Sequence, residues 1–296
     1  MIARRLHSLF FLFALSGAAA AQTVTLTDDR GRVVTLEQPA TRIVSLAPNL
    51  TELLFDAGAG EHLVGVVAYS DYPEAAQRVP RVGEAARIDA EQILELKPDL
   101  VVAWMTGNNR EDYERLERLG LKVYVVELGT IAGIPGKIED LGRLTGTEAT
   151  ARHAAEDFRA RFDTLRRHYA GRQTVSVFYQ IWERPLMTIN GAHFISDVLR
   201  QCGGENVFAS LTLLAPTVDL EAVIAADPQV ILINDSAGSP DNWRRWPAVT
   251  AARFGNLFTI NDDLISRPTS RLLDGMEQLC GILDTARKRV YPVDRP

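Results

Sequence analysis

The chain has 296 residues, of which 46% are hydrophobic and 24% are charged, and its formal net charge is -6. This composition is ordinary for a globular protein and excludes a disordered tail, a collagen-like rod and a disulfide-dense miniprotein. The length suits one large domain or two modest ones, and the negative charge argues against a nucleic-acid-binding protein.

The amino terminus has the pattern of a secretory signal peptide at residues 1–21. Arg4 and Arg5 precede an apolar run at residues 9–15 (LFFLFAL), and residues 19–21 (AAA) form a small-residue cleavage site. The run is shorter than the roughly 20 apolar residues of a membrane-spanning helix. No cysteine lies near the cleavage site, so we expect an exported, soluble, periplasmic chain without a lipid anchor.

Short apolar segments alternate with helical ones along the rest of the chain. Residues 23–36 alternate apolar and polar side chains around a central turn, which predicts a β-hairpin. Residues 42–46 then predict a short strand, followed by a helix from near Leu50, with Asn49 and Glu52 at the spacing of a capping box. The alternation continues along the chain and predicts parallel sheets that are covered on both faces.

Two distant segments have matching sequences. Residues 89–103 (DAEQILELKPDLVVA) align with residues 219–233 (DLEAVIAADPQVILI), sharing Asp, Glu and Pro at matching places and a common apolar pattern. Each segment predicts an Asp N-cap, a short helix, a turn at the proline and a buried strand. The repeat indicates a duplicated lobe, and the alternative is a chance similarity between two helix–turn–strand units.

A long helix is predicted between the two repeated segments. Residues 147–170 contain no Gly or Pro, and apolar residues such as Phe158 and Phe162 recur there at helical spacing, which indicates one helix of roughly 22 residues. We therefore expect an α/β fold of two Rossmann-like lobes with mainly parallel sheets, at residues 22–146 and 171–296. The helix joins these lobes, and a ligand cleft is expected between them.

The sequence contains no recognisable catalytic or metal-binding motif. It lacks a G-x-S-x-G elbow and a Walker loop. Its five histidines do not cluster in the sequence. They are His7, His62, His153, His168 and His193. We therefore expect no metal site and no catalysis. A periplasmic enzyme without a recognisable motif is the alternative from a different functional class.

The two cysteines, Cys202 and Cys280, both lie in the exported part of the chain. An oxidising compartment permits a disulfide between them, whereas the alternative is two separate buried thiols. Their spacing does not suit a metal site or a CxxC redox motif.

Four segments in combination resemble a known family of transport proteins. They are residues 42–55 (RIVSLAPNLTELLF), 68–73 (AYSDYP), 89–104 and 202–208 (CGGENVF). The chain resembles the helical-backbone periplasmic binding proteins of ABC importers, and among these it is most similar to the cobalamin receptors. The resemblance implies a monomer with little hinge motion that captures a corrinoid and delivers it to a transporter permease. It implies no cofactor, because cobalamin is the cargo.

The resemblance also implies which residues contact the ligand. Tyr69 and Trp104 match aromatic residues that face the corrin, and Asp263 and Arg267 match a pair that contacts its polar periphery. Alternative roles are a supporting aromatic for Tyr69 and a local surface ion pair for the other two. The remaining ligand-binding candidates are Trp182, at the end of a strand of the second lobe, and Asn49.

Two acidic residues and the cysteines match further features of the family. Glu91 and Glu221, one in each repeated segment, match the pair that docks onto arginines of the permease. Their alternative role is local, because an acidic residue near a helix N-terminus is favoured by the helix dipole alone. Cys202 and Cys280 match the family's disulfide in the second lobe.

The sequence departs from the enterobacterial-type receptors at two positions. Ala85 and Ala215 stand where those receptors have tryptophans in the cleft, so the aromatic platform is thinner. Haem and a ferric siderophore therefore remain alternative ligands. Haem would bind through iron coordinated by Tyr69, and a ferric siderophore would need several cationic side chains where only Arg267 can be placed.

Overall fold

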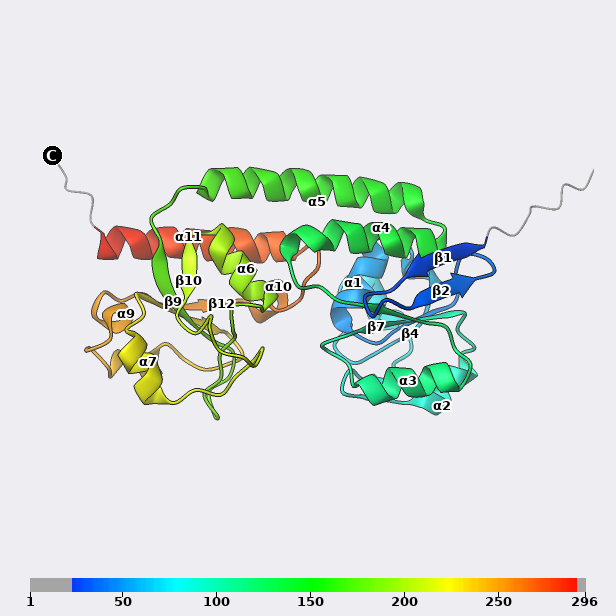
Figure 1. Ribbon diagram of the computed structural model, residues 1–296, viewed down its shortest axis with the longest axis horizontal. Helices are drawn as coiled ribbons and strands as arrows, with labels where there is room; N and C mark the ends of the chain where they lie inside the picture. Colours follow the sequence, from blue (N-terminus) through cyan, green and yellow to red (C-terminus); the bar gives the residue numbers. More distant parts are fainter. Residues whose placement is uncertain (1–22, 292–296) are drawn as a thin grey trace, which may run out of the picture.

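The computed structural model describes residues 23–291, which form two lobes along a long helix, α5 (Glu148–Tyr169) (Figure 1). This helix has 22 residues, as the sequence predicts, and runs along one side of the molecule past both lobes. The expected signal peptide at residues 1–21 lies outside the described residues. Within residues 23–291, no helix combines the length and the apolar character needed to cross a membrane.

Each lobe is built on a four-stranded parallel sheet, and both sheets have the same topology. The strand order is β4-β3-β7-β8 in the N-terminal lobe and β10-β9-β11-β12 in the C-terminal lobe. In both, the second strand along the chain lies outside the first, which confirms two α/β lobes of one pattern. The N-terminal strands are β3 (Ile43–Ser45), β4 (Leu63–Val66), β7 (Leu100–Trp104) and β8 (Val123–Val126). The C-terminal strands are β9 (Val175–Gln180), β10 (Gly204–Asn206), β11 (Val230–Asn234) and β12 (Leu257–Ile260).

The predicted hairpin at residues 23–36 is present as β1 (Val24–Thr27) and β2 (Val33–Leu36). Its turn is held by Asp28, whose Oδ1 accepts the backbone N–H groups of Arg30 and Arg32 at 3.0 and 2.9 Å. A second antiparallel pair consists of β5 (Gly83–Glu84) and β6 (Arg87–Ile88).

Helices cover both faces of the sheets. On the side of α5 lie α1 (Pro48–Asp56), α4 (Ile134–Thr145), α6 (Phe194–Gln201) and α11 (Leu272–Val290). On the opposite side lie α2 (Ala90–Glu95), α3 (Arg110–Arg118) and α7 (Leu220–Ala226). The short helices are α8 (Asp241–Arg244), α9 (Thr250–Arg253), α10 (Asp262–Ile265) and the 3₁₀ turns Gly60–His62, Glu74–Arg78 and Ile131–Gly133.

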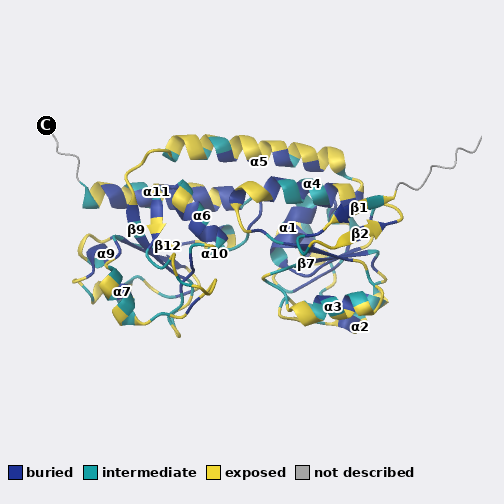
Figure 2. Cartoon of the chain, viewed as in Figure 1, coloured by how far each residue is buried: buried dark blue, intermediate teal, exposed yellow. Residues whose placement is uncertain are grey.

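Alternate residues of the central strands point into different cores. In β7, Leu100 and Val102 join a core that contains residues of both lobes, whereas Val101 and Ala103 join a core with residues of α2 and α3. Strand β11 follows the same alternation between the shared core and a core beneath α7 and α8. The period of two is that of a strand covered on both faces. The strands are accordingly buried, whereas the outer face of α5 is exposed (Figure 2).

The internal repeat is confirmed in three dimensions. Asp89 caps α2 and Asp219 caps α7 by accepting backbone N–H groups of the first helical turn. From residue 91 to 100 and from 221 to 230, buried, half-buried and exposed positions follow one another in the same order. The two segments therefore form equivalent helix–turn–strand units, with β7 and β11 at equivalent places in their sheets.

The predicted capping box at the start of α1 is wrong. The helix begins at Pro48, its N-cap is Ala47, and no side chain caps it. Proline is common at the first helical position because its fixed φ suits the helix. An N–H group at that position would have no partner within the helix, so its loss costs nothing. Asn49 therefore lies inside the first turn, and the Glu52 carboxylate makes its contacts in the other lobe.

Candidate functional site

The strand order predicts one ligand-binding position in each lobe. In open parallel sheets, ligands bind outside the carboxyl ends of the strands, where the strand order reverses. This point lies between β3 and β7 in the N-terminal lobe and between β9 and β11 in the C-terminal lobe. Asn49 follows β3, Trp104 ends β7, and Trp182 follows β9, so three predicted ligand residues lie at these two points.

Trp104 is held in place by the segment that follows β7. A Cβ atom at Gly107 would lie 2.0 Å from Cε3 of Trp104, so the ring packs directly on a glycine backbone. The backbone N–H of Trp104 donates to Oδ1 of Asn108 at 2.7 Å, and Nδ2 of Asn108 donates to the Leu46 carbonyl at 2.7 Å. These bonds tie the carboxyl ends of β7 and β3 together, which fixes the tryptophan relative to both strands.

Asn49 is buried without polar partners. Its side chain is 2% exposed, and neither its Oδ1 nor its Nδ2 has a hydrogen bond within residues 23–291. The indole Nε1 of Trp104 is also buried and unpaired in the same range. Because buried polar groups are normally hydrogen-bonded, such exceptions call for an explanation. Both lie at the reversal of strand order in the N-terminal lobe, which keeps them candidates for ligand contact.

Tyr69 projects from a loop whose backbone is fixed on either side. The residue is 73% exposed and has φ of 64°, in the left-handed region. Ala68 donates its N–H to the Gly83 carbonyl at 2.8 Å, and Arg81 donates to the carbonyl of Ser70 at 2.8 Å. A non-glycine residue in this conformation costs about 1 kcal/mol, and such strain clusters at ligand-binding sites.

Trp182 supplies an exposed aromatic ring in the C-terminal lobe. Its side chain is 54% exposed, and its indole N–H donates to the Arg184 carbonyl at 3.0 Å. With Ser236 and Gly238 it lines a pocket of about 350 Å³ at the reversal between β9 and β11. That Trp182 faces Trp104 across a cleft stays a prediction.

Asp263 and Arg267 form a local ion pair, which was the alternative to ligand contact, and Arg267 also reaches the other lobe. Its guanidinium lies 2.8 Å from Asp263, 2.9 Å from Asp71 and 3.2 Å from Glu52. Asp71 and Glu52 belong to the N-terminal lobe, so Arg267 contacts both lobes. Partial burial acts to raise the pKa of Asp71, but the hydrogen bond and charge of Arg267 outweigh it and lower that pKa.

Glu52 has a role that its sequence pattern did not predict. Its carboxylate is 2% exposed, accepts the hydroxyl of Thr269 at 2.9 Å and lies 3.2 Å from Arg271 as well as from Arg267. The Arg271 guanidinium lies 4.0 Å above the ring of Tyr72. Burial raises the pKa of Glu52, and Arg271, Thr269 and Arg267 offset only part of this effect. A charged residue in an apolar helical run was the available signal, but it was assigned to a cap.

Glu91 and Glu221 occupy equivalent exposed positions. Each is the second residue of its helix, α2 or α7, and Asp89 and Asp219 make the caps without them. Both helices lie on the side of the molecule opposite α5 (Figure 1), so one partner surface can reach both.

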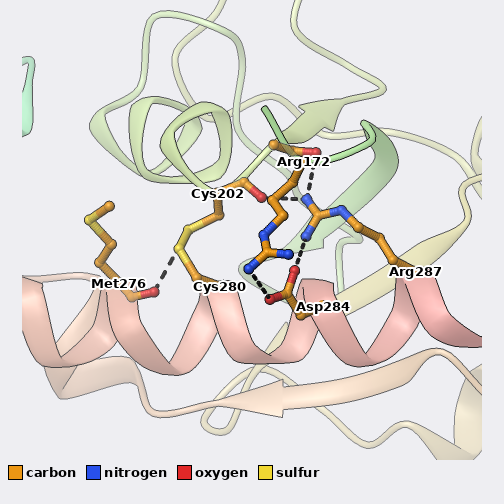
Figure 3. Close-up of a disulfide and its surroundings, with 7 residues drawn as sticks. Arg172, Cys202, Met276, Cys280, Asp284 and Arg287 are labelled. Carbon is orange, nitrogen blue, oxygen red and sulfur yellow. Dashed lines mark hydrogen bonds and ion pairs between the residues drawn. A yellow bond between two sulfur atoms is a disulfide. The ribbon is translucent and has the colours of Figure 1, made fainter. Parts of the chain in front are cut away.

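The disulfide between Cys202 and Cys280 is confirmed and joins the end of α6 to α11 (Figure 3). The Cα atoms are 4.8 Å apart, and both residues are fully buried. Arg287 of α11 donates to the carbonyl of Cys202 and lies 2.5 Å from Asp284. The disulfide therefore lies beside a partly buried polar cluster where α6 packs on α11.

The two alanines in place of family tryptophans lie in different settings. Ala85 is half-buried, and its carbonyl accepts Nδ2 of Asn108 at 3.0 Å. Ala215 is exposed and follows Leu213 and Leu214, which are 68% and 39% exposed. Leucine side chains thus supply apolar surface beside Ala215. Among the described residues, no group of three or more His, Cys, Asp or Glu could hold a metal ion.

The sequence pattern of the periplasmic binding proteins matches residues 43–264, a range that includes both sheets. The chain belongs to the periplasmic binding protein family. It is 40% identical to the vitamin B12-binding protein of Vibrio cholerae over 253 residues, which cover 85% of this chain and 92% of that protein. It is 36% identical to the vitamin B12-binding protein of Yersinia pestis, over 91% of this chain and 93% of that one.

Solved structures of the family share the fold. The crystal structure of the periplasmic vitamin B12 binding protein of Vibrio cholerae has a TM-score of 0.80 at 39% identity, covering 84% of this chain and 99% of that one. A periplasmic heme-binding protein from Roseiflexus sp. RS-1 has a TM-score of 0.74 at 23% identity, covering 83% and 99%. The second similarity extends to the fold alone. Together with the α5 helix, these structures confirm the predicted two-lobed architecture.

Proposed function

We propose that this chain is a periplasmic receptor that captures cobalamin and delivers it to the permease of an ABC importer. The observation that carries the proposal is the 40% identity to the Vibrio cholerae vitamin B12-binding protein, because it extends over 85% of the chain and so over both lobes. Exposed rings at Tyr69 and Trp182 support it, since a flat macrocycle is held by aromatic faces and edges.

In this proposal the ligand lies in a cleft between the carboxyl ends of the two sheets. The N-terminal lobe contributes Tyr69, Trp104 and Asn49, and the C-terminal lobe contributes Trp182. Asp263 and Arg267 contact the polar periphery of the ring. The cobalt ion arrives chelated by the corrin, so the ligand residues serve to hold and orient the macrocycle rather than the metal.

Delivery assigns a different surface to the permease. Glu91 and Glu221 are the docking residues, because they are exposed, equivalent in the two lobes and carried by α2 and α7, two helices on the same side of the molecule (Figure 1). The proposed receptor is a periplasmic monomer without a cofactor. It comprises lobes at residues 22–146 and 171–296 and a linker at residues 147–170, after removal of the signal peptide at residues 1–21.

Haem is the second candidate ligand, because an exposed tyrosine such as Tyr69 can coordinate iron. A ferric siderophore fits less well. An anionic chelate needs several unpaired cations, whereas the one cation proposed for the cleft, Arg267, already contacts three carboxylates. A periplasmic enzyme has no motif in its favour.

Titration of the purified apo-protein with cyanocobalamin and with haemin tests the proposal. We expect one-to-one binding of cyanocobalamin by calorimetry and no tyrosinate–iron absorption band with haemin. Tight one-to-one binding of haemin with that band, and no binding of cyanocobalamin, would replace the proposal by the haem receptor.

A further inference from the structure

One segment of the C-terminal lobe is held by the N-terminal lobe. Residues 267–271, which we call the interlobe segment, connect α10 to α11. Arg267, Thr269 and Arg271 all contact Glu52, and the hydroxyl of Ser270 donates to Asp56 at 2.7 Å. Both acidic residues lie on α1, one helical turn apart. A single helix of one lobe therefore holds four residues of the other.

We propose that Glu52 is a positioning residue for ligand binding, which sets the place of the Arg267 guanidinium from the opposite lobe. This inference rests on the proposed function, in which Arg267 contacts the ligand. Both oxygens of the Glu52 carboxylate already have partners in the interlobe segment, so Glu52 acts through Arg267 rather than on the ligand itself.

The burial of Glu52 distinguishes it from the other carboxylates around Arg267. The side chains of Asp71 and Asp263 are 51% and 57% exposed, whereas that of Glu52 is 2% exposed. Exposed ion pairs contribute little because water screens them and the side chains stay mobile. A buried carboxylate with partners on both oxygens has one arrangement, since any other leaves a desolvated charge unpaired.

Thr269 and Arg271 keep the Glu52 carboxylate in that arrangement. Thr269 is fully buried and donates to Oε2, while the guanidinium groups of Arg267 and Arg271 both lie 3.2 Å from Oε1. Arg271 is itself held against the ring of Tyr72. The orientation of Arg267 is thus defined by the N-terminal lobe, although the residue follows α10 of the C-terminal lobe. A ligand contacting Arg267 would meet a group fixed relative to both lobes.

The test is a double-mutant cycle on the cyanocobalamin dissociation constant. Glu52→Gln keeps the shape and the hydrogen bond of Thr269 but removes the charge that holds Arg267. We expect it to raise Kd about tenfold, as for loss of a buried charged hydrogen bond of modest strength. In an Arg267→Ala background, the same substitution should change Kd by less than about twofold, since coupled residues are not additive.

Asp56→Asn is the matched control. Asp56 is a half-buried acidic residue of the same helix, burial raises its pKa, and it contacts the interlobe segment at Ser270 rather than at Arg267. We expect this variant to leave Kd within about twofold of the wild type. An equal rise of Kd in both variants would mean that Glu52 only stabilises the lobe interface, and would overturn the inference.

Two further outcomes are decisive. An unchanged Kd in Glu52→Gln, or an effect that adds in full to that of Arg267→Ala, overturns the inference while the proposed function stands. A wild type that does not bind cyanocobalamin overturns both. If Glu52→Gln does not fold, Thr269→Val replaces it, because it removes only the hydroxyl that orients Glu52. This variant should raise Kd in the wild type and leave Arg267→Ala unchanged, and any other result overturns the inference.

Discussion

The carboxylate of Glu52 lies 3.2 Å from the guanidinium of Arg267, although the two residues are 215 positions apart and belong to different lobes. Glu52 extends from a helix packed into the core that both lobes share. The position of the Glu52 carboxylate is therefore fixed by the packing of its helix in the core. Contacts between the lobes include the polar contacts of the interlobe segment with Glu52, Asp56 and Asp71 and a continuous apolar core, in addition to the α5 helix.

These contacts between the lobes should limit how far the lobes can separate. Opening the lobes would separate the Glu52 carboxylate from Arg267 and Arg271 and expose part of the shared core. Both changes are costly, because buried charges need their partners and apolar surface is driven out of water. We therefore expect the lobes to stay at a nearly constant spacing, in line with the little hinge motion implied by the family resemblance.

Replacing Tyr69 by glycine should weaken ligand binding without destabilising the fold. Glycine adopts the φ of 64° without strain, which offsets its greater entropy in the unfolded chain, so the unfolding free energy should change by less than about 1 kcal/mol. Loss of a central aromatic contact should cost about 2 kcal/mol, a roughly thirtyfold rise in Kd. Calorimetric titration with cyanocobalamin and urea unfolding measure the two effects.

Lys97→Gly is the matched control for this backbone. Lys97 also has positive φ, 48°, but lies between α2 and β7, away from the ligand candidates. Its replacement should leave Kd unchanged. Equal losses of affinity in both variants would show that backbone flexibility, rather than the Tyr69 ring, decides binding.

Reversing the charge of Glu91 or Glu221 to lysine should reduce cobalamin uptake and leave ligand binding unchanged. In the proposed docking, each substitution would replace an attraction to a basic permease surface by a repulsion, so we expect a fall in uptake of roughly tenfold or more per site. Glu148→Lys is the control, because Glu148 is also exposed in the first turn of a helix, α5, on the opposite side of the molecule. Uptake of labelled cyanocobalamin by cells that depend on this receptor measures the effect. A similar fall for the control would contradict the docking role.

Removing the disulfide should lower stability and spare the binding site. The bond closes a loop between residues separated by 78 positions, which in the chain-entropy model stabilises the fold by about 4.5 kcal/mol. We expect the Cys202→Ala/Cys280→Ala variant to unfold at lower urea concentration with unchanged Kd for cyanocobalamin. A reductant should destabilise the wild type and have no effect on the double variant. Equal stability of the reduced and oxidised wild type would contradict this expectation.

His193 should make the fold less stable at acidic pH. Its Nδ1 accepts the backbone N–H of Ile195 at 3.2 Å, which caps α6, and burial lowers its pKa to about 4 from the ordinary 6.5. Between these values the unfolded chain binds more protons than the folded one. Stability is therefore lost as pH falls from about 6.5 towards 4, by about 3 kcal/mol at most.

The variant His193→Asn isolates this effect, because asparagine also caps a helix but does not titrate in this range. Its melting temperature should fall less between pH 7.5 and pH 5 than that of the wild type. His153→Asn, at an exposed position of α5, should keep the wild-type pH dependence. If His193→Asn behaves as the wild type does, the His193 imidazole does not govern acid stability.

Much of the fold could be predicted because its signals are local. The repeat of residues 89–103 at 219–233, the uninterrupted helix at α5 and the hairpin at residues 23–36 each follow from spacing within one segment. The Cys202–Cys280 pair was permitted by composition and compartment and matched by family resemblance. Local patterns also predicted that Trp104 and Trp182 lie at strand ends. In the structure, these strand ends lie beside the reversals of strand order.

What the sequence by itself determined is the set of elements, because hydrophobic periodicity, caps and turns act over a few residues. The tertiary structure alone decided the burial of Asn49 and the partners of Glu52. Their spacing matched a capping box, but Pro48 starts the helix earlier and Glu52 is buried against Arg267 and Thr269 of the other lobe. A buried charge takes the partners that folding brings to it, and these come from a segment that no local pattern connects to α1.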